Sequence, residues 1–240
     1  MMAEAPHRRV AEPMMLPEAT GGVRLYLCRH GQTDYNAKGM IQGCGIDREL
    51  SEVGLAQAVC IGEALREVPL DVVGSSTLKR AMQTAEAVRK HHATANSVEH
   101  RGLREMDFGD FEGKRPDEVQ DLYDSVTGAW AEGRLDAAWP AGESPLEVVK
   151  RARQALIDIL GATHQNTTRH VALVTHGRLN KILLSSLLGL GLQNSHHLTQ
   201  ANCCINVIDI HTPIDTSDSV HTQVILNYVA HLQEEITPSQ

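Results

Sequence analysis

Residues 23–31 read VRLYLCRHG, a short apolar run that ends in an arginine, a histidine and a glycine. The run follows Gly21-Gly22 and has the length and composition of a buried strand rather than of a helix. A second compact run, VALVT at 171–175, leads directly into His176-Gly177. The sequence therefore predicts two buried strands that each end in a histidine and a glycine.

Strand and helix patterns alternate along the rest of the chain. Apolar residues at steps of three and four predict helices over 51–68, 78–91, 144–163 and 179–188. Short apolar runs predict further strands over 70–76, 203–210 and 222–229, with a brief strand at the start of 97–115. Pro116 opens a short helix, and we expect 128–142 to be a surface excursion. This alternation predicts one α/β domain from about residue 23 to 235.

The helix predicted over 144–163 carries the clearest local signal. Ser144 is a favoured N-cap, Pro145 suits the first helical position, and Glu147 completes a capping box. The residues expected to face the core from this helix are Leu146, Val149, Leu156 and Leu160.

The composition excludes several classes of protein. Of the 240 residues, 42% are apolar and 22% are charged, as in ordinary globular proteins. A formal charge of −8 at pH 7 argues against a protein that binds nucleic acid through its phosphates. The longest apolar stretch, around 182–192, is too short and too often interrupted to span a membrane. We expect neither nucleic acid nor a membrane as a partner, and the oligomeric state stays open.

The five cysteines lack paired CxxC spacing, so they indicate neither a disulfide framework nor a zinc ribbon. The adjacent pairs His196-His197 and Cys203-Cys204 are poorly placed to surround one tetrahedral ion, and we expect no metal. Residues 1–22 have the composition of a disordered lead and no apolar core of a secretory signal. A cytoplasmic location is therefore expected.

Polar signatures follow three of the predicted strands. They are Arg29-His30-Gly31, Ser75-Ser76 with Arg80 one helical turn later, and His176-Gly177. Sites in mainly parallel sheets form beyond the carboxyl ends of the strands. If these strands are neighbours, two histidines and two arginines converge on one pocket. The glycine after each histidine would let the backbone turn sharply and a ligand approach closely.

This combination of residue types favours phosphoryl chemistry. Guanidinium forks match the oxygens of a tetrahedral anion, and phosphate is the anion expected. A histidine imidazole is a competent nucleophile for covalent capture of a phosphoryl group. The leaving oxygen needs a proton, and Glu105 on the charged loop 97–115 is the candidate acid.

Five stretches of the chain together resemble the histidine phosphatase superfamily, also called the phosphoglycerate-mutase-like family. They are LCRHGQTDYN at 27–36, IQGCGIDRELSEVGLAQA at 41–58, SSTLKRAMQTA at 75–85, LREMDFGDFEGK at 103–114 and VTHGRLNKILL at 174–184. Five motifs in family order are far more specific than a single Arg-His-Gly. The resemblance implies a three-layer α/β/α sandwich with a mainly parallel central sheet.

The resemblance also implies the roles of individual residues. His30 would be the nucleophile that becomes phosphohistidine, and Glu105 the proton donor. The positions that would contact phosphate or substrate are Arg29, Asn36, Gln42, Arg80, His176 and Gly177. No metal or organic cofactor is implied, because the arginines neutralise the charge. Arg178 either reaches a second anionic group of the substrate or points to solvent.

Members of this family divide between phosphatases and mutases. The loop LREMDFGDFEGK resembles the phosphatases, because mutases carry Arg-His-Tyr-Gly after the glutamate. Only about 70 positions separate Glu105 from His176, fewer than in the mutases. We therefore expect a phosphatase that hydrolyses phosphomonoesters of small metabolites. The alternatives are a cofactor-dependent phosphoglycerate mutase, a catalytically silent module that binds phosphorylated ligands, and a metal-dependent hydrolase.

Overall fold

The computed structural model describes residues 13–19, 22–161, 168–211, 214 and 221–232. Its sheet has the strand order β3-β2-β4-β1-β5-β6. The strands are β1 (Val23–Arg29), β2 (Val72–Ser75), β3 (Asn96–Glu99), β4 (Arg169–Thr175), β5 (Ile205–Ile210) and β6 (His221–Tyr228). The first four strands of this order are mutually parallel, and β5 runs antiparallel to both β1 and β6. The expected mainly parallel sheet is confirmed.

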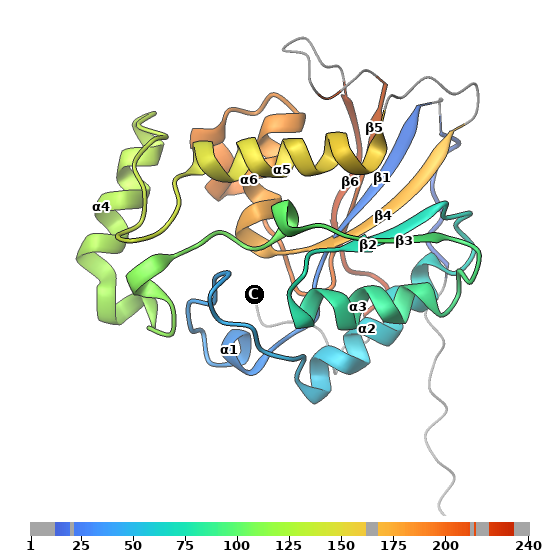
Figure 1. The fold of residues 1–240 in the computed structure, drawn as a ribbon, viewed down its shortest axis with the longest axis horizontal. Coiled ribbons are helices and arrows are strands. Elements are labelled where there is room, and N and C mark those ends of the chain that lie inside the picture. Colours follow the sequence, from blue (N-terminus) through green and yellow to red (C-terminus); the bar gives the residue numbers. More distant parts are fainter. Residues whose placement is uncertain (1–12, 20–21, 162–167, 212–213, 215–220, 233–240) are drawn as a thin grey trace, which may run out of the picture.

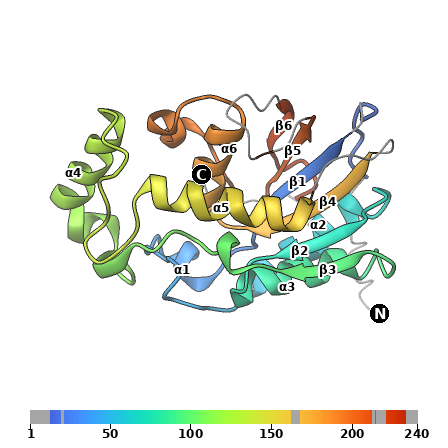
Figure 2. The same cartoon turned by 45° about the horizontal axis from the view of Figure 1, so that its top comes forward.

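Helices cover both faces of this sheet (Figures 1 and 2). One face carries α2 (Glu52–Leu65) and α3 (Lys79–Arg89), and the other carries α5 (Pro145–Leu160) and α6 (Gly177–Leu187). The remaining short elements are α1 (Asp34–Ala37), η1 (Arg101–Leu103), η2 (Gly109–Phe111), η3 (Pro116–Val119) and η4 (Leu192–His197). The architecture is therefore the expected three-layer α/β/α sandwich.

Alternate residues of the central strands enter two separate apolar cores. Leu25 and Leu27 pack on the side of α5 and α6, whereas Tyr26 and Cys28 pack on the side of α2 and α3. Side chains of a strand point alternately to opposite faces of the sheet. Because both faces of β1 are covered, its sequence reads as a continuous apolar run rather than as an alternating one.

The helix at Ser144 begins as predicted, but its buried face differs from the expectation. The Ser144 hydroxyl accepts the Glu147 amide and the Glu147 carboxylate accepts the Ser144 amide, so the capping box is formed. Leu156 and Leu160 are buried, whereas Leu146 is 45% exposed and its inward placement was wrong. Leu146 is the second residue of α5, and the buried stripe there runs through Val148 and Ala152 instead.

The segment expected to be a surface excursion contains a core residue. It begins with the end of α4 (Gln120–Ala131), and Trp139 beyond it is 1% exposed. Its ring lies between 4.9 and 5.5 Å from the rings of Phe108, Phe111, Tyr123 and Trp130. This aromatic cluster ties α4 to the loop after Glu105, at the end of the molecule where α4 projects (Figure 1).

Part of the segment before β1 packs against the domain. Met14 is buried among residues of the α2 and α3 core, and its amide donates to the Ala64 carbonyl at 3.1 Å. Residues 1–12 and 20–21 of the predicted lead lie outside the described residues. Within the described ranges, no helix has the length and apolarity that crossing a bilayer requires.

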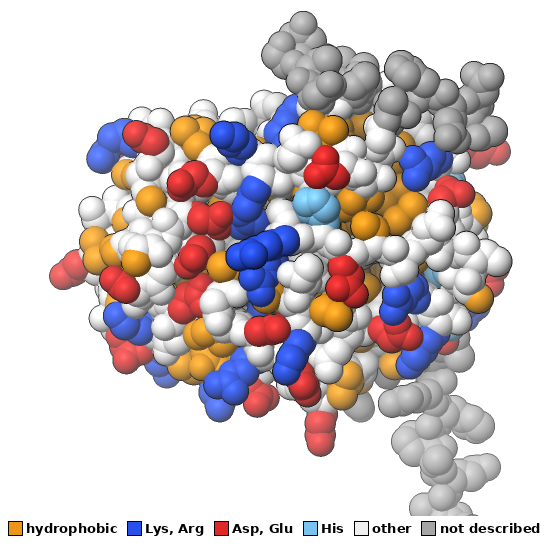
Figure 3. Space-filling model, in the orientation of Figure 1, with side chains coloured by type: hydrophobic (Ala, Val, Ile, Leu, Met, Phe, Trp, Pro, Cys, Tyr) orange, Lys and Arg blue, Asp and Glu red, His pale blue; other side chains and the backbone are white. Residues whose placement is uncertain are grey.

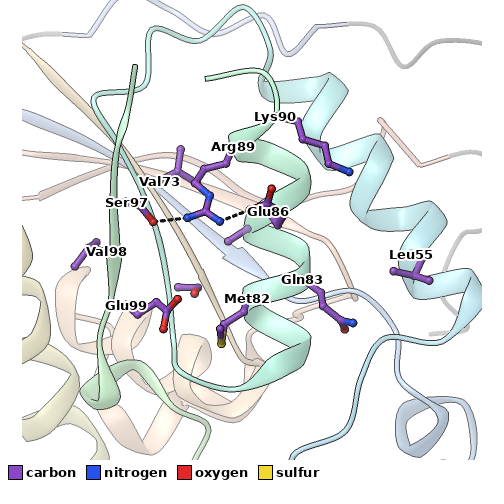
Figure 4. A pocket seen from close by; sticks show the side chains of 12 residues that line it. Leu55, Val73, Met82, Gln83, Glu86, Arg89, Lys90, Ser97, Val98 and Glu99 are labelled. Carbon is purple, nitrogen blue, oxygen red and sulfur yellow. Dashed lines mark hydrogen bonds and ion pairs between the residues drawn. The ribbon is translucent and has the colours of Figure 1, made fainter. Parts of the chain in front are cut away.

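The surface carries charges of both signs, and a groove between α3 and β3 lies away from the histidines. Acidic and basic side chains are interspersed over the face shown in Figure 3. The groove has a volume of about 420 Å³ and lies between α3 and β3 (Figure 4). Arg89 crosses it to the Ser97 hydroxyl, and Lys90 lies at its edge, at the opposite end of α3 from Arg80.

Candidate active site

The adjacent strands β2, β4 and β1 bring the predicted polar signatures together at their carboxyl ends. The Nε–H of Arg80 faces two acceptors, His30 Nε2 and His176 Nδ1, each at 3.2 Å. The two imidazole rings lie 5.1 Å apart between centroids. All three side chains are buried. The structure thus places two histidines around one guanidinium group, as the neighbouring strands require.

The hydrogen bonds assign the tautomer of each histidine. His30 Nδ1 lies 2.7 Å from the Gly31 carbonyl, which only accepts, so Nδ1 carries the proton and Nε2 offers a lone pair. His176 Nδ1 accepts from Arg80, so its Nε2–H donates to the Ser76 hydroxyl at 2.7 Å. The lone pair of His30 Nε2 is therefore directed toward Arg80.

Burial and neighbouring charge keep these imidazoles neutral. Burial holds the pKa of His30 well below its ordinary value of 6.5, and the Arg80 and Arg29 charges act in the same direction. Burial, Arg80 and His30 lower the pKa of His176 in the same way. Burial also lowers the pKa of Arg80 to about 10, so this guanidinium stays charged at neutral pH. Neutral histidines beside charged arginines suit nucleophilic attack on an anion.

Arg29 has hydrogen-bonding capacity left over. Its Nη1 donates to the Gln200 carbonyl at 2.5 Å, while its buried Nε has no hydrogen-bond partner among the described residues. A Cβ on Gly177 would lie 3.1 Å from that Nε, so glycine here leaves room for the guanidinium. A buried unpaired donor calls for a partner, and a phosphate oxygen is one that fits this site.

The glycine after His30 serves packing rather than ligand approach. A Cβ on Gly31 would lie 2.5 Å from the carbonyl oxygen of Gly54 in the first turn of α2. The expectation that this glycine admits a ligand is therefore not what the geometry shows. The glycine brings α2 close to the loop that follows His30.

Glu105 is buried at the N-terminus of α6. Its two carboxylate oxygens accept the backbone amides of Met106, Arg178 and Leu179 at 2.8 to 3.0 Å. Arg151 donates to the Glu105 carbonyl and pairs through two bonds with Glu143, which fixes the loop. The charge of Glu105 acts on both Arg29 and Arg80, which places the carboxylate beside the predicted pocket.

Asn36 and Gln42 are both anchored by Thr33 in the loop that follows His30. Asn36 Oδ1 accepts from the Thr33 amide and from Asn202 Nδ2. Gln42 is buried, accepts from the Thr33 hydroxyl at 2.7 Å and donates to the Ile46 carbonyl at 3.3 Å. The Asn36 side chain therefore retains its NH₂ group for a ligand, whereas the amide of Gln42 is engaged with the protein.

Arg178 does not point freely into solvent. Its Nη2 donates to the Tyr123 hydroxyl of α4 at 2.8 Å, and its guanidinium lies 5.7 Å from the ring centroid of Trp130. Both partners belong to α4. We call residues 120–142, which include this helix and Trp139, the cap. Arg178 thus links this cap to the helix that begins at Gly177.

Sequence reasoning missed several residues that support the site. Asn202 Nδ2 donates to the His30 carbonyl and to Asn36, and Arg151 holds the Glu105 loop. Lys181 is half-buried on α6 and its pKa is sensitive to the charges of Arg29 and Glu105. None of these three residues lies at the end of a predicted strand, where the site residues were expected. The i, i+3 spacing of Arg178 and Lys181 was a usable signal on the helix.

One group of potential metal ligands lies near this site. The ligand atoms of Cys44, Asp107 and Glu112 lie within 4.8 Å of one another. Burial raises the pKa of the Cys44 thiol to about 11, and Glu112 already accepts the amides of Gly45 and Phe108. These hydrogen bonds account for the position of Glu112 without an ion, so we assign no metal to the group. Cys203 and Cys204 are buried, as expected.

The geometry agrees with what comparison with known proteins finds. The profile of the histidine phosphatase superfamily, branch 1, matches residues 25–215. Glucosyl-3-phosphoglycerate phosphatase of Mycolicibacterium vanbaalenii is 38% identical over 180 residues, covering 71% of this chain and 76% of the relative. The protein named "Probable phosphoglycerate mutase GpmB" of Erwinia tasmaniensis is 32% identical over 187 residues, covering 78% of this chain and 85% of the relative.

Solved structures show the same relationship. Mycobacterial glucosyl-3-phosphoglycerate phosphatase in complex with inorganic phosphate matches with a TM-score of 0.70 at 29% identity. The match covers 88% of this chain and 99% of that chain. With His30 and His176 both facing Arg80, the chain belongs to the histidine phosphatase superfamily, branch 1.

Proposed function

We propose that the protein is a phosphatase that hydrolyses phosphomonoesters of small metabolites through a phosphohistidine at His30. The observation that carries this proposal is the position of Arg80, whose Nε–H faces the unprotonated Nε2 of His30 and Nδ1 of His176 at 3.2 Å. A phosphate bound to this guanidinium meets a neutral imidazole lone pair. The names of relatives such as glucosyl-3-phosphoglycerate phosphatase support the substrate class.

The proposed reaction has two steps. His30 Nε2 attacks phosphorus, the bond to the ester oxygen breaks, and Glu105 in its protonated form gives that oxygen its proton. Water then attacks the phosphohistidine, Glu105 takes up a proton from the water, and inorganic phosphate leaves. Arg29, Arg80 and His176 stabilise the charge on the phosphoryl oxygens, and a bound metal is not required for this role.

Other proposed contacts complete the pocket. The NH₂ group of Asn36 and the backbone amide of Gly177 donate to phosphate oxygens, and Gln42 supports the substrate-facing loop. Arg178 contacts the part of the substrate that leaves. Residues 23–235 act as one catalytic domain in the cytoplasm.

The mutase is the second candidate, because one relative carries that name. Phosphatase is favoured because the loop after Glu105 reads MDFGDFEGK rather than the mutase sequence. The second reason is the small segment between Glu105 and α5, which in the described chain holds only one α-helix longer than two turns, α4. A mutase returns the phosphoryl group to a hydroxyl group of the substrate and needs a cap that excludes water.

The decisive experiment measures phosphate release from a panel of phosphomonoesters and phosphoglycerates in the presence of EDTA. His30→Ala is measured beside the wild type, and both proteins are checked for folding by circular dichroism. Metal-independent release that His30→Ala abolishes supports the proposal, and an alkaline quench followed by mass spectrometry should detect phosphohistidine. Interconversion of phosphoglycerates without release would replace the phosphatase by the mutase.

A further inference from the structure

Lys181 is a cation without a partner beside the proposed phosphate pocket. It is half-buried on α6, and it forms neither a hydrogen bond nor an ion pair with any residue in the described part of the chain. Side chains of a helix tilt toward its N-terminus, so Lys181 extends toward Gly177 and Arg178. Partly burying a charge without a partner costs free energy, which a bound anion offsets.

Arg178 presents a second cation on the same face of α6. Residues three apart on a helix are neighbours, and Arg178 lowers the pKa of Lys181 through charge repulsion. The Tyr123 hydroxyl and the Trp130 ring hold the guanidinium of Arg178, and no carboxylate of the described residues pairs with it. The two cations are therefore held close together without an acidic partner.

The nearest acidic group does not neutralise this pair. Glu105 raises the pKa of Lys181, so its charge is felt there, but its oxygens accept three backbone amides. The two charges of a phosphate monoester dianion are matched by Arg29 and Arg80 alone. With the Glu105 charge counted as well, a surplus of one positive charge remains beside the proposed phosphate site after the phosphate is bound, and neither Lys181 nor Arg178 pairs with a carboxylate of the described residues.

We propose that Lys181 and Arg178 bind a second anionic group of the substrate, so that the preferred substrates are phosphate esters that also carry a carboxylate or a second phosphate. The inference rests on the proposed phosphatase function and makes Lys181 a specificity-determining residue. Lys181 follows Gly177 by four residues, or about 6 Å along the helix axis. The second anionic group is therefore only a few bonds from the ester phosphate.

The test uses a matched set of three-carbon substrates. Glycerol 3-phosphate and 3-phosphoglycerate differ only in a hydroxymethyl group in place of a carboxylate, and glycerol 1,3-bisphosphate carries a second phosphate instead and keeps the hydroxyl group on the central carbon. The measured quantity is the ratio of kcat/KM for each anionic substrate to that for glycerol 3-phosphate. Lys181→Met removes the charge and keeps the apolar stem, Lys181→Arg keeps the charge, and Lys90→Met is the control at the distant groove of Figure 4.

Lys181→Met should lower the ratio for at least one anionic substrate by about tenfold or more, since a charge-assisted hydrogen bond is lost. Lys181→Arg should retain most of the ratio, and Lys90→Met should leave the rates and the ratios unchanged. A larger loss of the ratio for 3-phosphoglycerate identifies the second anionic group as a carboxylate, and a larger loss for the bisphosphate identifies it as a phosphate. If Lys181→Met lowers kcat/KM equally for all three substrates, or lowers it for none, the inference is overturned.

Failure of the proposed function has a different signature. If the wild type releases no phosphate from any of the three esters or from p-nitrophenyl phosphate, the phosphatase itself is wrong. If it releases phosphate but does not discriminate through Lys181, only the second anion site is wrong. Thermal unfolding of each variant distinguishes a specific loss from a folding defect, and Lys181→Arg gives a second readout if Lys181→Met unfolds.

The pH dependence of the ratio is an independent readout. Burial, together with the charges of Arg178 and Arg29 and against the opposing charge of Glu105, lowers the pKa of Lys181 to about 8. Lys181 is protonated below this pKa, so the ratio in the wild type should fall as pH rises through about 8. In Lys181→Arg the guanidinium stays charged, and the ratio should stay level to pH 9. An equal fall in both proteins would contradict the assignment.

Discussion

His30 and His176 face the same Nε–H of Arg80 with opposite ring nitrogens, Nε2 from the first and Nδ1 from the second. The Gly31 carbonyl and the Ser76 hydroxyl engage the nitrogens on the far side of each ring. Two neighbouring histidines are therefore fixed as different tautomers. This asymmetry agrees with the proposed roles of His30 as the nucleophile and His176 as a group that stabilises charge.

Replacing Arg80 by lysine should lower kcat/KM for p-nitrophenyl phosphate by about 100-fold. Arg80 also donates to the carbonyls of Ile46 and Gly43, and a lysine cannot keep this planar set of donors while it contacts both histidines. Steady-state kinetics on folded protein checks the value. Activity within threefold of the wild type would show that positive charge alone is sufficient.

The acid limb of kcat/KM should lie well below pH 6.5. Burial and the neighbouring arginines lower the pKa values of His30 and His176, so both rings stay neutral where an exposed histidine is already half protonated. A pH–rate profile between 4 and 8 measures the limb. An inflection at 6.5 or above in the free enzyme would contradict this electrostatic account.

The lowered pKa values of His30 and His176 also predict how the stability of the protein depends on pH. Below about 6.5 the unfolded chain binds protons at these two histidines and the folded chain does not, so the free energy of unfolding should fall as pH drops. Urea unfolding at pH 7.5 and 5.5 gives the difference. The double variant His30→Gln/His176→Gln should show a shallower dependence, and an unchanged slope would assign the loss to other groups.

Glu105→Gln should affect poor leaving groups far more than good ones. Hydrolysis of an alkyl phosphate should slow by at least about 100-fold, because the ester oxygen loses its proton donor, whereas p-nitrophenolate leaves without one. Rapid-quench measurement of the first turnover isolates this step. Full turnover of an alkyl phosphate by the variant would remove Glu105 from the role of acid.

Tyr123→Phe should weaken the hold of the cap on Arg178. Loss of the 2.8 Å bond from Nη2 to the Tyr123 hydroxyl should raise KM for a carboxylated substrate by about threefold to tenfold with a small change in kcat. Tyr228→Phe on β6, at the edge of the sheet, is the matched control. Equal effects of the two variants would mean that the cap does not position Arg178.

Trp139→Ala should destabilise the protein by about 3 to 5 kcal/mol, because a large side chain buried among four aromatic rings is removed. Leu146→Ala, at a side chain that is 45% exposed, should cost about 0.5 kcal/mol or less. Urea unfolding measures both. Similar losses in the free energy of unfolding for the two variants would show that the packing of Trp139 contributes little to stability.

The strands and the convergence of the histidines were predictable because the sequence marks both. An apolar run followed by a histidine and a glycine places that histidine at the carboxyl end of a buried strand, and parallel neighbours bring such ends together. His30 and His176 therefore meet as expected, although their strands are far apart in sequence. The same reasoning located Arg80 through its spacing from Ser76.

The contacts that were not predicted depend on packing between distant elements. Trp139 lies in a segment without periodicity, and only its aromatic character signalled a buried position. The pairing of Arg178 with Tyr123 requires the cap to lie over α6, which no local pattern encodes. Leu146 was expected inside because it fits the apolar stripe of its helix, but in the first turn of α5 the buried residues are Pro145 and Val148, and Leu146 lies on the exposed side.

The position of β1 between β4 and β5 has a consequence for synthesis of the chain. Thr175 of β4 bonds to the carbonyl of Cys28 in β1 across 147 positions, and β5 follows later still. At a translation rate of about 5 to 20 residues per second, β1 waits on the order of 10 s for its first partner strand. During that interval a strand that is buried on both faces in the folded protein has both edges unpaired. Early handling of the nascent chain by chaperones is thus expected to concern residues 23–29 above all.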